Sequence, residues 1–426
     1  MKIKTRDLPY EQVLALPRPE HRPPMRPSLL FRSLMRVLGS ADLKDAQFSY
    51  TVEGLDRLGE EPCLILMNHS SFIDLELVSA IFYPRPYCIV CTSDGFVGKE
   101  GLMRRLGCIP TNKFVSDLTL LADMQHALRE EKCSVLLYPE ASYSFDCTAT
   151  PLPRRMGLML KRLDVPVVSV LTEGAFARDP LYNCLQKRHV PVSARARLLF
   201  SREELREKSV DELDAALDEL FSFDNFRWQR EKGLEIREPF RADGLHRILY
   251  KCAHCGAEGR TEGKGTRLRC HACGKEYELE PLGNLRALEG ETEFSHIPDW
   301  YAWERSEVRR ELEEGRYLLD VPVKIGMLVD FKAIYLVGEG RLRQDAGGFL
   351  LTGCGGKLRF ERPAKLNYSL YADYFWYELG DIICIGDRDT QYYCFPEEGV
   401  PVAKARLATE ENYKLLRRTQ RKAAEV

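Results

Sequence analysis

Between about residues 48 and 200, short apolar runs of this 426-residue chain alternate with segments of helical periodicity. The runs "CLILM", "YCIVC", "CSVLLY" and "VPVVSVL" are rich in Val, Ile, Leu and Cys, which is typical of strands buried on both faces. Between them, "FIDLELVSAIF", "KEGLMRRLG", "SDLTLLADMQHALREEK" and "RRMGLMLKRLD" have the period of helices. The alternation predicts an α/β domain whose largely parallel sheet is flanked by helices.

Polar side chains follow two of these predicted strands. His69 and Asp74 come after "CLILM", and Glu140 comes after "CSVLLY". Ligands gather beyond the carboxyl ends of strands in open α/β sheets, so parallel neighbours would bring the three groups together. A neutral imidazole can accept a proton from an alcohol that attacks a carbonyl, and a carboxylate can fix its tautomer. The alternative is a structural histidine that caps a helix.

Ser70 and Ser71 lie beside this histidine, but they do not form a nucleophile-elbow pattern. Direct acyl transfer to an acceptor hydroxyl is therefore a simpler prediction than a covalent acyl-enzyme.

Four cysteines form two CxxC pairs separated by 14 residues, and they are Cys252, Cys255, Cys270 and Cys273. Two short knuckles with this spacing supply four thiolates around a tetrahedral ion, which is the pattern of a zinc ribbon. Because the protein would fill all four positions, we expect the zinc to be structural, and zinc is preferred to iron. The formal net charge of -2 and the lack of aromatic interleaving argue against nucleic-acid binding by this module.

The length of the chain exceeds that of one ordinary core, so several domains are expected. Residues 1–44 are predicted to form an N-terminal arm with an amphipathic helix. Residues 45–240 are predicted to form the α/β domain and 245–285 the zinc ribbon. Residues 290–426 alternate in the strand period with frequent glycines before a final helix, which predicts a mostly-β domain. A pleckstrin-homology-like topology is one interpretation of this domain.

The arm contains "SLLFRSLMRVLG", which we expect to be a helix that ends at Gly39 as a C-terminal cap. This helix either packs on the α/β domain or lies in a membrane interface with its arginines at the headgroups. No run of 18 or more apolar residues exists, and the N-terminus has no apolar signal core. These features, with mostly isolated cysteines, predict a cytoplasmic protein. One face of the expected helix is apolar, and it comprises Leu30, Phe31, Leu34, Met35 and Leu38.

The segment "NHSSFID" resembles the His-x4-Asp block of the glycerolipid acyltransferases, the family of the 1-acyl-glycerol-3-phosphate and other lysophospholipid acyltransferases. Later segments resemble further blocks of that family in the same order. "GCIPTNK" is similar to its Gly-x-Ile block, "YPEASYS" to its Pro-Glu-Gly-Thr-Arg-Ser block, and "VPVVSV" to its closing Val-Pro strand. The resemblance covers about residues 45 to 200. The whole arrangement looks similar to bacterial lysophospholipid acyltransferase-like proteins that carry an appended zinc ribbon.

The resemblance implies an O-acyltransferase that moves a fatty acyl group from acyl-CoA or acyl carrier protein to the hydroxyl of a lysophospholipid. The acceptor implied first is 1-acyl-glycerol-3-phosphate, which gives phosphatidate. His69 would be the general base, Asp74 its partner and Glu140 a group that organises the acceptor site. Such an enzyme works on bilayer lipids, so we expect peripheral binding at the inner face of the membrane.

Two departures from the family pattern concern the acceptor site. Lys113 stands where the second block usually has arginine, and it offers a cation without a bidentate fork. Tyr143 stands where the third block usually has a phosphate-binding arginine. The acceptor is then bound differently, or it is not lysophosphatidate. The altered block also leaves an alternative, a lipid-binding or regulatory protein that uses the acyltransferase fold without catalysis. The predicted substrate-binding residues are Asn68, Lys113, Ser142, Tyr143, Arg154 and Arg155.

Overall fold

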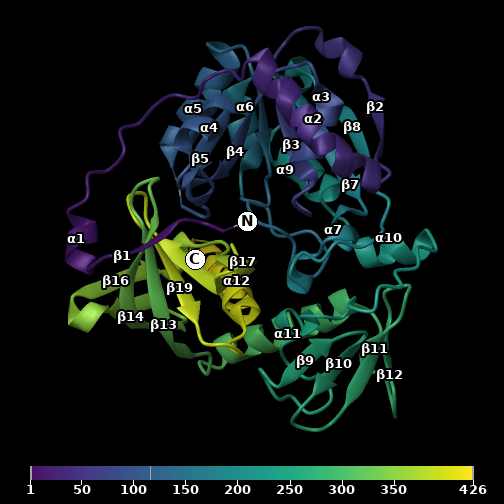
Figure 1. Cartoon of the computed structure of the whole chain (residues 1–426), viewed down its shortest axis with the longest axis vertical. Coiled ribbons are helices and arrows are strands. Elements are labelled where there is room, and N and C mark those ends of the chain that lie inside the picture. The colour runs from purple at the N-terminus through teal and green to yellow at the C-terminus, as the bar shows by residue number, and fades with distance from the viewer. Residues whose placement is uncertain (1, 116, 425–426) are drawn as a thin grey trace.

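The computed structural model describes residues 2–115 and 117–424, with side chains described as far as Thr419 (Figure 1). A seven-stranded sheet has the order β2-β8-β7-β3-β6-β4-β5. Every neighbouring pair is parallel except β7 and β8, so the sheet is mixed, and the predicted parallel part comprises β7, β3, β6, β4 and β5. The strands are β2 (Ser49–Glu53), β3 (Leu64–Met67), β4 (Tyr87–Thr92), β5 (Cys108–Thr111), β6 (Ser134–Leu137), β7 (Val167–Glu173) and β8 (Ser193–Phe200).

Helices cover both faces of this sheet. Alternate residues of β3 point to opposite faces, so Leu64 and Leu66 join one apolar core and Ile65 and Met67 another. The first core includes Leu160 of α6, and the second includes residues of α3. The helices of this half of the chain are α2 (Leu29–Asp45), α3 (Asp74–Phe82), α4 (Glu100–Arg105), α5 (Leu118–Arg129), α6 (Met156–Leu163), α7 (Ala175–Arg178), α8 (Arg202–Glu207), α9 (Val210–Leu220) and α10 (Asn225–Glu231).

Helix α2 corrects one prediction, because it continues through Gly39 and ends at Asp45. Gly39 is buried inside the helix rather than at its C-terminal cap. A Cβ atom at this position would lie 3.1 Å from Cβ and Cγ of Glu76 on α3. The glycine therefore allows α2 and α3 to approach closely. The pattern of residues within α2 alone does not indicate this contact with another helix.

A small antiparallel sheet has four strands, β9 (Thr261–Lys264), β10 (Arg267–Cys270), β11 (Glu276–Leu279) and β12 (Leu285–Ala287). Of the four cysteines, Cys270 ends β10, Cys252 and Cys255 come before β9, and Cys273 lies between β10 and β11. Helix α11 (Ile297–Glu313) follows, in a region that was predicted to be mostly β. Trp300 of α11 is fully buried, and its indole N–H donates to the carbonyl of Lys251 beside the first cysteine pair at 2.9 Å. The module is thus held against α11.

The C-terminal region contains the predicted antiparallel strands and final helix. Its sheet has the order β16-β15-β14-β13-β19-β18-β17 and is followed by α12 (Val402–Ala424). The pleckstrin-homology-like topology stays a prediction. The strands are β13 (Leu319–Leu328), β14 (Ile334–Asp345), β15 (Gly348–Gly353), β16 (Leu358–Pro363), β17 (Tyr371–Trp376), β18 (Gly380–Gly386) and β19 (Gln391–Pro396).

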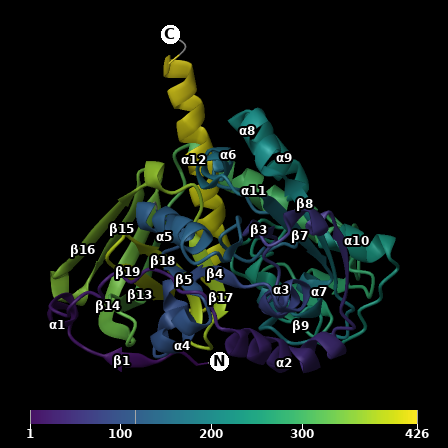
Figure 2. The same cartoon turned by 90° about the horizontal axis from the view of Figure 1, so that it is seen from above.

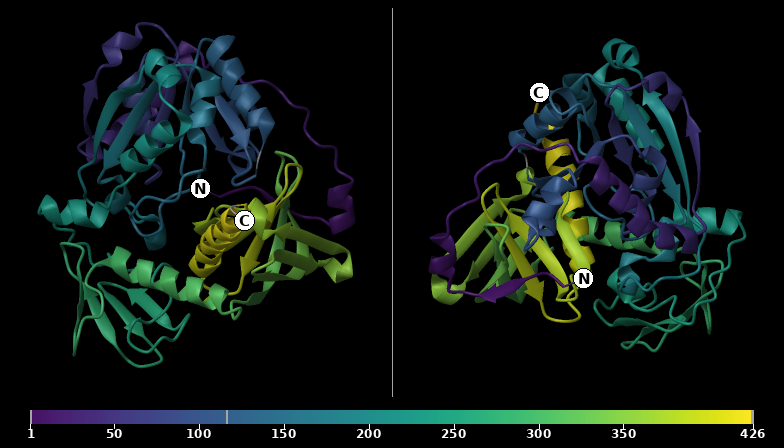
Figure 3. Two further views of the ribbon diagram at one scale, coloured as in Figure 1. Left: turned by 180° about the vertical axis from the view of Figure 1, so that it is seen from behind. Right: turned by 45° about the horizontal axis from the view of Figure 1, so that its top comes forward.

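The N-terminal residues connect the C-terminal sheet with the α/β domain. β1 (Thr5–Asp7) pairs parallel with β14 of the C-terminal sheet, and α1 (Tyr10–Leu14) follows it. The chain then returns to the α/β domain (Figure 3). There the ring nitrogen Nε2 of His21 lies 2.9 Å from Asp123 on α5. The predicted N-terminal arm is therefore a strap between two domains.

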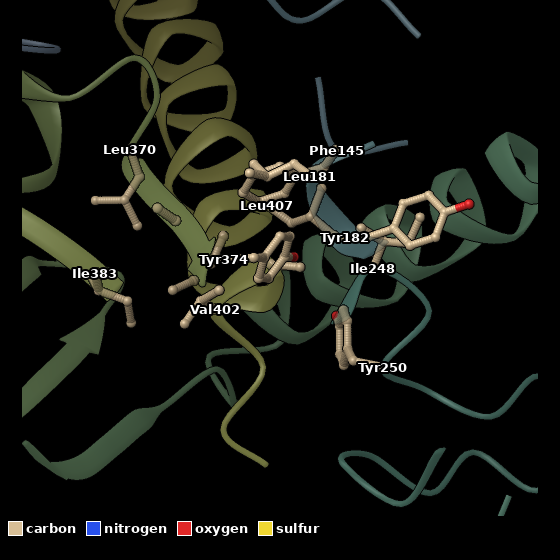
Figure 4. Close-up of a cluster of buried hydrophobic side chains, with 14 of the residues drawn as sticks. Phe145, Leu181, Tyr182, Ile248, Tyr250, Leu370, Tyr374, Ile383, Val402 and Leu407 are labelled. Atoms are coloured by element: carbon tan, nitrogen blue, oxygen red, sulfur yellow. The ribbon is translucent and has the colours of Figure 1, made fainter. Parts of the chain in front are cut away.

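The α/β domain, the small sheet and the C-terminal sheet surround α11 and α12, and α12 projects beyond the domains at its C-terminal end (Figure 2). Across the described residues, none of the helices combines the length and the apolarity that a membrane crossing requires. One continuous apolar cluster includes Phe145 of the α/β domain, Tyr250 beside the small sheet, Tyr374 of β17 and Leu407 of α12 (Figure 4). This shared core fixes the C-terminal domain beside the carboxyl ends of the parallel strands.

Candidate active site

The imidazole of His69 lies at the carboxyl end of β3, in the turn that leads into α3. Its Nδ1 atom is 3.0 Å from Oδ2 of Asp74, the first residue of α3. The same oxygen accepts hydrogen bonds from the backbone N–H groups of Ser70 at 2.9 Å and Ser71 at 3.2 Å. Because Asp74 engages Nδ1, the imidazole presents Nε2 as its proton acceptor. The side chain of His69 is 16% exposed, so a substrate hydroxyl can reach it.

Glu140 reaches the same edge of the sheet, because β3 and β6 are parallel neighbours. Its Oε1 accepts the backbone N–H of His69 at 3.2 Å. Its Oε2 accepts the backbone N–H and the hydroxyl of Thr150 at 3.0 and 2.9 Å. The carboxylate thus fixes the backbone of His69 and braces residues 138–150, here called the Glu140 loop.

Two tyrosines enclose the imidazole. The ring centroid of Tyr138 lies 4.0 Å from that of His69, and the centroid of Tyr143 lies 3.9 Å from it. The rings are nearly parallel, at interplanar angles of 24° and 28°. Tyr143 occupies the position of the family's arginine and stacks on the predicted base. Ala141, in the place of the family's glycine, has a left-handed φ of 56°.

The surroundings keep the imidazole neutral. Burial and the nearby positive charge of Lys113 hold the pKa of His69 well below its usual 6.5. Burial raises the pKa of Asp74 above its usual 3.8, and the N–H groups of Ser71 and Ser70 act in the opposite direction by stabilising the carboxylate. Burial likewise raises the pKa of Glu140 to about 7. A neutral imidazole at neutral pH is the protonation state that a general base requires.

Lys113 comes after β5, and its surroundings include the C-terminal domain. Its Nζ atom lies 4.1 Å from the ring centroid of Tyr371 on β17. Burial lowers the pKa of Lys113, while the negative charges of Asp373 on β17 and of Asp94 raise it. The hydroxyl of Tyr371 donates to Asp94 at 2.8 Å. The C-terminal domain therefore forms one wall beside Lys113, the cation that is predicted to bind the acceptor lipid.

The other predicted substrate-binding residues lie in different surroundings. Asn68 is buried and fully hydrogen-bonded, because its Oδ1 accepts the backbone N–H of Thr172 at 2.8 Å and its Nδ2 donates to the carbonyl of Thr172 and to a serine hydroxyl. The hydroxyl of Ser142 is buried and has no hydrogen-bond partner within the described part of the chain. Arg154 and Arg155 are exposed at the start of α6. No described contact joins either guanidinium to His69.

Tyr138 and Tyr371 are site residues that were not among those predicted from the sequence. Tyr138 directly precedes the Pro-Glu pair of the third block, and its position beside a strand end was the available signal. Tyr371 reaches Lys113 only through the docking of a separate domain, and no local pattern indicates that contact.

The four cysteines of the small sheet have the geometry of a metal site. Their Sγ atoms all lie within 4.8 Å of one another. The Sγ atoms of Cys252 and Cys273 are 3.9 Å apart, and those of Cys255 and Cys270 are 3.8 Å apart. Zinc–sulfur bonds of ~2.3 Å in a tetrahedron place the sulfur atoms about 3.8 Å apart, so the four thiols fit such an ion. The predicted cysteine set therefore comes together as one cluster that can hold a metal.

Comparisons with known proteins assign the domain that carries His69. Residues 49–173 match a family model described as Acyltransferase. A search of the solved structures finds similarity to the 1-acyl-sn-glycerophosphate (LPA) acyltransferase PlsC from Thermotoga maritima, with 16% identity and a TM-score of 0.32. That match covers 45% of this chain and 81% of the other. A search of the curated proteins finds no match.

Proposed function

Because residues 49–173 form a domain of the acyltransferase family, we propose that the protein transfers a fatty acyl group from a thioester to the hydroxyl of a lysophospholipid. The donor is acyl-CoA or acyl carrier protein. The acceptor that the sequence blocks favour is 1-acyl-glycerol-3-phosphate, and the product is then phosphatidate. The observation that carries the proposal is the contact of 3.0 Å between His69 and Asp74 at the carboxyl end of β3.

In the proposed reaction, Nε2 of His69 accepts the proton of the acceptor lipid's hydroxyl while the oxygen of that hydroxyl attacks the thioester carbonyl. The C–O bond forms, the C–S bond breaks, and the imidazolium returns the proton to the leaving thiolate. Asp74 accepts the Nδ1 hydrogen bond and stabilises the imidazolium. Tyr138 and Tyr143 hold the ring between them, and Glu140 fixes its backbone.

Lys113 is the proposed partner of the acceptor's phosphate, since its positive charge acts on His69. A compact ammonium lacks the bidentate fork of arginine, so the phosphate would be held less rigidly than at an arginine site. Arg154 and Arg155 remain proposed contributors of charge from the exposed start of α6. The proposed zinc of the cysteine cluster is structural and stabilises its module.

The outer surface of α2 supports binding to a membrane surface. Leu30 is 75% exposed and Leu38 is 68% exposed, and Leu102 of α4 is also exposed. Arginines lie along both helices, at Arg36 and Arg105, and they would meet anionic headgroups. We propose peripheral binding at the cytoplasmic face of the membrane through this surface.

The membrane proposal is tested by flotation with anionic vesicles. Leu38→Asp should reduce the bound fraction, whereas Leu318→Asp, at a residue 53% exposed before β13, should not. Equal binding of both variants and the wild type would remove α2 from the interface.

A second function, lipid binding without catalysis, is favoured by one observation, the replacement of the family's arginine by Tyr143 on the face of His69. The two functions are separated by an acceptor panel presented on vesicles with radiolabelled acyl donors. Acyl transfer by the wild type and by the control variant His126→Ala, but not by Asp74→Asn, supports the enzymatic function. Vesicle binding without transfer to any acceptor supports the lipid-binding alternative.

A further inference from the structure

The C-terminal helix contacts the Glu140 loop directly. Arg406 of α12 is only 3% exposed. Its Nη1 donates a hydrogen bond to the backbone carbonyl of Tyr143 at 3.2 Å. Its guanidinium carbon lies 4.4 Å from the ring centroid of Phe145. One side chain of α12 therefore holds the loop on both sides of Ser144.

The direction of Arg406 is itself fixed by buried partners. Its Nε donates to Oε1 of Glu410, one turn further along α12, at 3.2 Å. Glu410 is 1% exposed and also accepts hydrogen bonds from Ser369 and from Arg305 of α11, each at 2.7 Å. A buried guanidinium requires such paired and hydrogen-bonded acceptors. The side chains of α11 and α12 thus form one ionic cluster that ends at the loop.

The apolar surroundings make this cluster a fixed support. Phe145 is buried, and its ring centroid lies 4.6 Å from that of Tyr374 on β17. Figure 4 shows Phe145 beside Leu407, the residue that follows Arg406 on α12. The packed core therefore holds α12 in place against the loop, and Arg406 connects the two.

Other hydrogen bonds also hold the loop, and among them the backbone N–H and the side-chain amide of Asn225 donate to the carbonyl of Cys147 at 3.1 and 3.2 Å. Besides the bonds of Glu140, the backbone N–H of Ser144 donates to the carbonyl of His69 at 3.4 Å, and the Ser144 hydroxyl donates to the carbonyl of Thr148 at 2.6 Å. The backbone of Ala141 has a left-handed conformation, which is unfavourable for an alanine and persists only when the surrounding structure holds it. Arg406 adds contacts with Tyr143 and Phe145 of the same loop from another domain.

We propose that Arg406 is a positioning residue for acyl transfer, which fixes the Glu140 loop so that Tyr143 and Glu140 hold His69 in its working orientation. The proposal deepens the proposed function and rests on it. It makes α12 and its domain a part of the catalytic unit rather than an appendage.

The test compares Arg406→Gln with Arg406→Lys and with Lys404→Gln in the full-length protein. Lys404 lies on the same helix and pairs with Glu258 and Glu311 at 2.7 and 2.9 Å, so its substitution removes partly buried ion pairs without touching the loop. Hydrogen–deuterium exchange is followed in peptides that cover residues 138–150, and kcat and KM are measured for the acyl donor.

We expect faster exchange of the loop in Arg406→Gln, with kcat about 10- to 100-fold lower, because a small displacement of catalytic groups costs that much. KM should change much less, since Arg406 contacts no substrate in the proposed site. Arg406→Lys should partly restore slow loop exchange and kcat, because lysine keeps the positive charge but cannot contact both the Tyr143 carbonyl and the Phe145 ring as the guanidinium does. Lys404→Gln should match the wild type in loop exchange and kcat.

Unchanged loop exchange in Arg406→Gln, unchanged kcat, or equal effects of Lys404→Gln would each overturn the proposal. Loop exchange needs no turnover, so it tests the anchoring even if the proposed acyl transfer itself is wrong.

Discussion

The buried carboxylate of Glu410 leads to a quantitative prediction about acid stability. Burial opposes its ionisation, but the positive charges of Arg305 and Arg406 and the hydrogen bond of Ser369 outweigh burial and lower the pKa from 4.5 to about 2. At ~1.4 kcal/mol for each pKa unit, the ionised form stabilises the fold by about 3 kcal/mol. Because the folded-state pKa is lowered, this contribution is complete above pH 4.5 and is lost as the pH falls toward 2.

Glu410→Gln mimics the protonated carboxyl. Its free energy of unfolding should therefore be about 3 kcal/mol below that of the wild type at pH 7, and the difference should shrink steadily between pH 4.5 and 2. Urea denaturation followed by tryptophan fluorescence at several pH values measures the difference. The matched control is Glu313→Gln, because Glu313 is half-exposed and pairs with Arg309 in an exposed i,i+4 contact, which is worth less than about 1 kcal/mol. A stability difference that stays constant from pH 7 to pH 3 would refute the reasoning.

Further predictions concern the site and the cysteine cluster. Lys113→Met removes a positive charge that lowers the pKa of His69, so the pKa of His69 should rise. The acid limb of the kcat–pH profile should then move to higher pH. An unmoved limb would contradict the assignment of His69 as the general base. Ala141→Val places a β-branched residue at φ 56° and should lower the free energy of unfolding by about 1–2 kcal/mol, whereas Ala141→Gly should stay within about 1 kcal/mol of the wild type in urea denaturation; equal tolerance of both would argue against the left-handed turn. Elemental analysis should find about one zinc ion per chain, and a strong chelator should make residues 250–290 sensitive to trypsin; resistance after complete metal removal would show that the module folds without metal.

The sequence predicted the parallel strands and the meeting of His69, Asp74 and Glu140 well, for a local reason. Buried parallel strands are continuous apolar runs, and the polar residues that follow them must lie at one edge of the sheet. The cysteine cluster was equally predictable, since ligand spacing within two knuckles is a local property. These features require no knowledge of how the domains dock.

The features that escaped prediction depend on contacts between distant segments. Gly39 was expected to end a helix, but its role is the close approach of α2 to α3. The wall beside Lys113 requires Tyr371 from another domain. Helix α11 differs, because its apolar spacing and the proline at its N-terminus were available signals.

In the proposed reaction, His69, held by Asp74, activates an acceptor hydroxyl for attack on an acyl thioester. The most direct test is release of free thiol from a long-chain acyl-CoA by purified protein on vesicles that contain 1-acyl-glycerol-3-phosphate, with the lipid product identified by mass spectrometry. We expect acceptor-dependent thiol release and formation of the diacyl product by the wild type, and loss of both in a folded His69→Ala variant. Acyl transfer that persists in His69→Ala would contradict it.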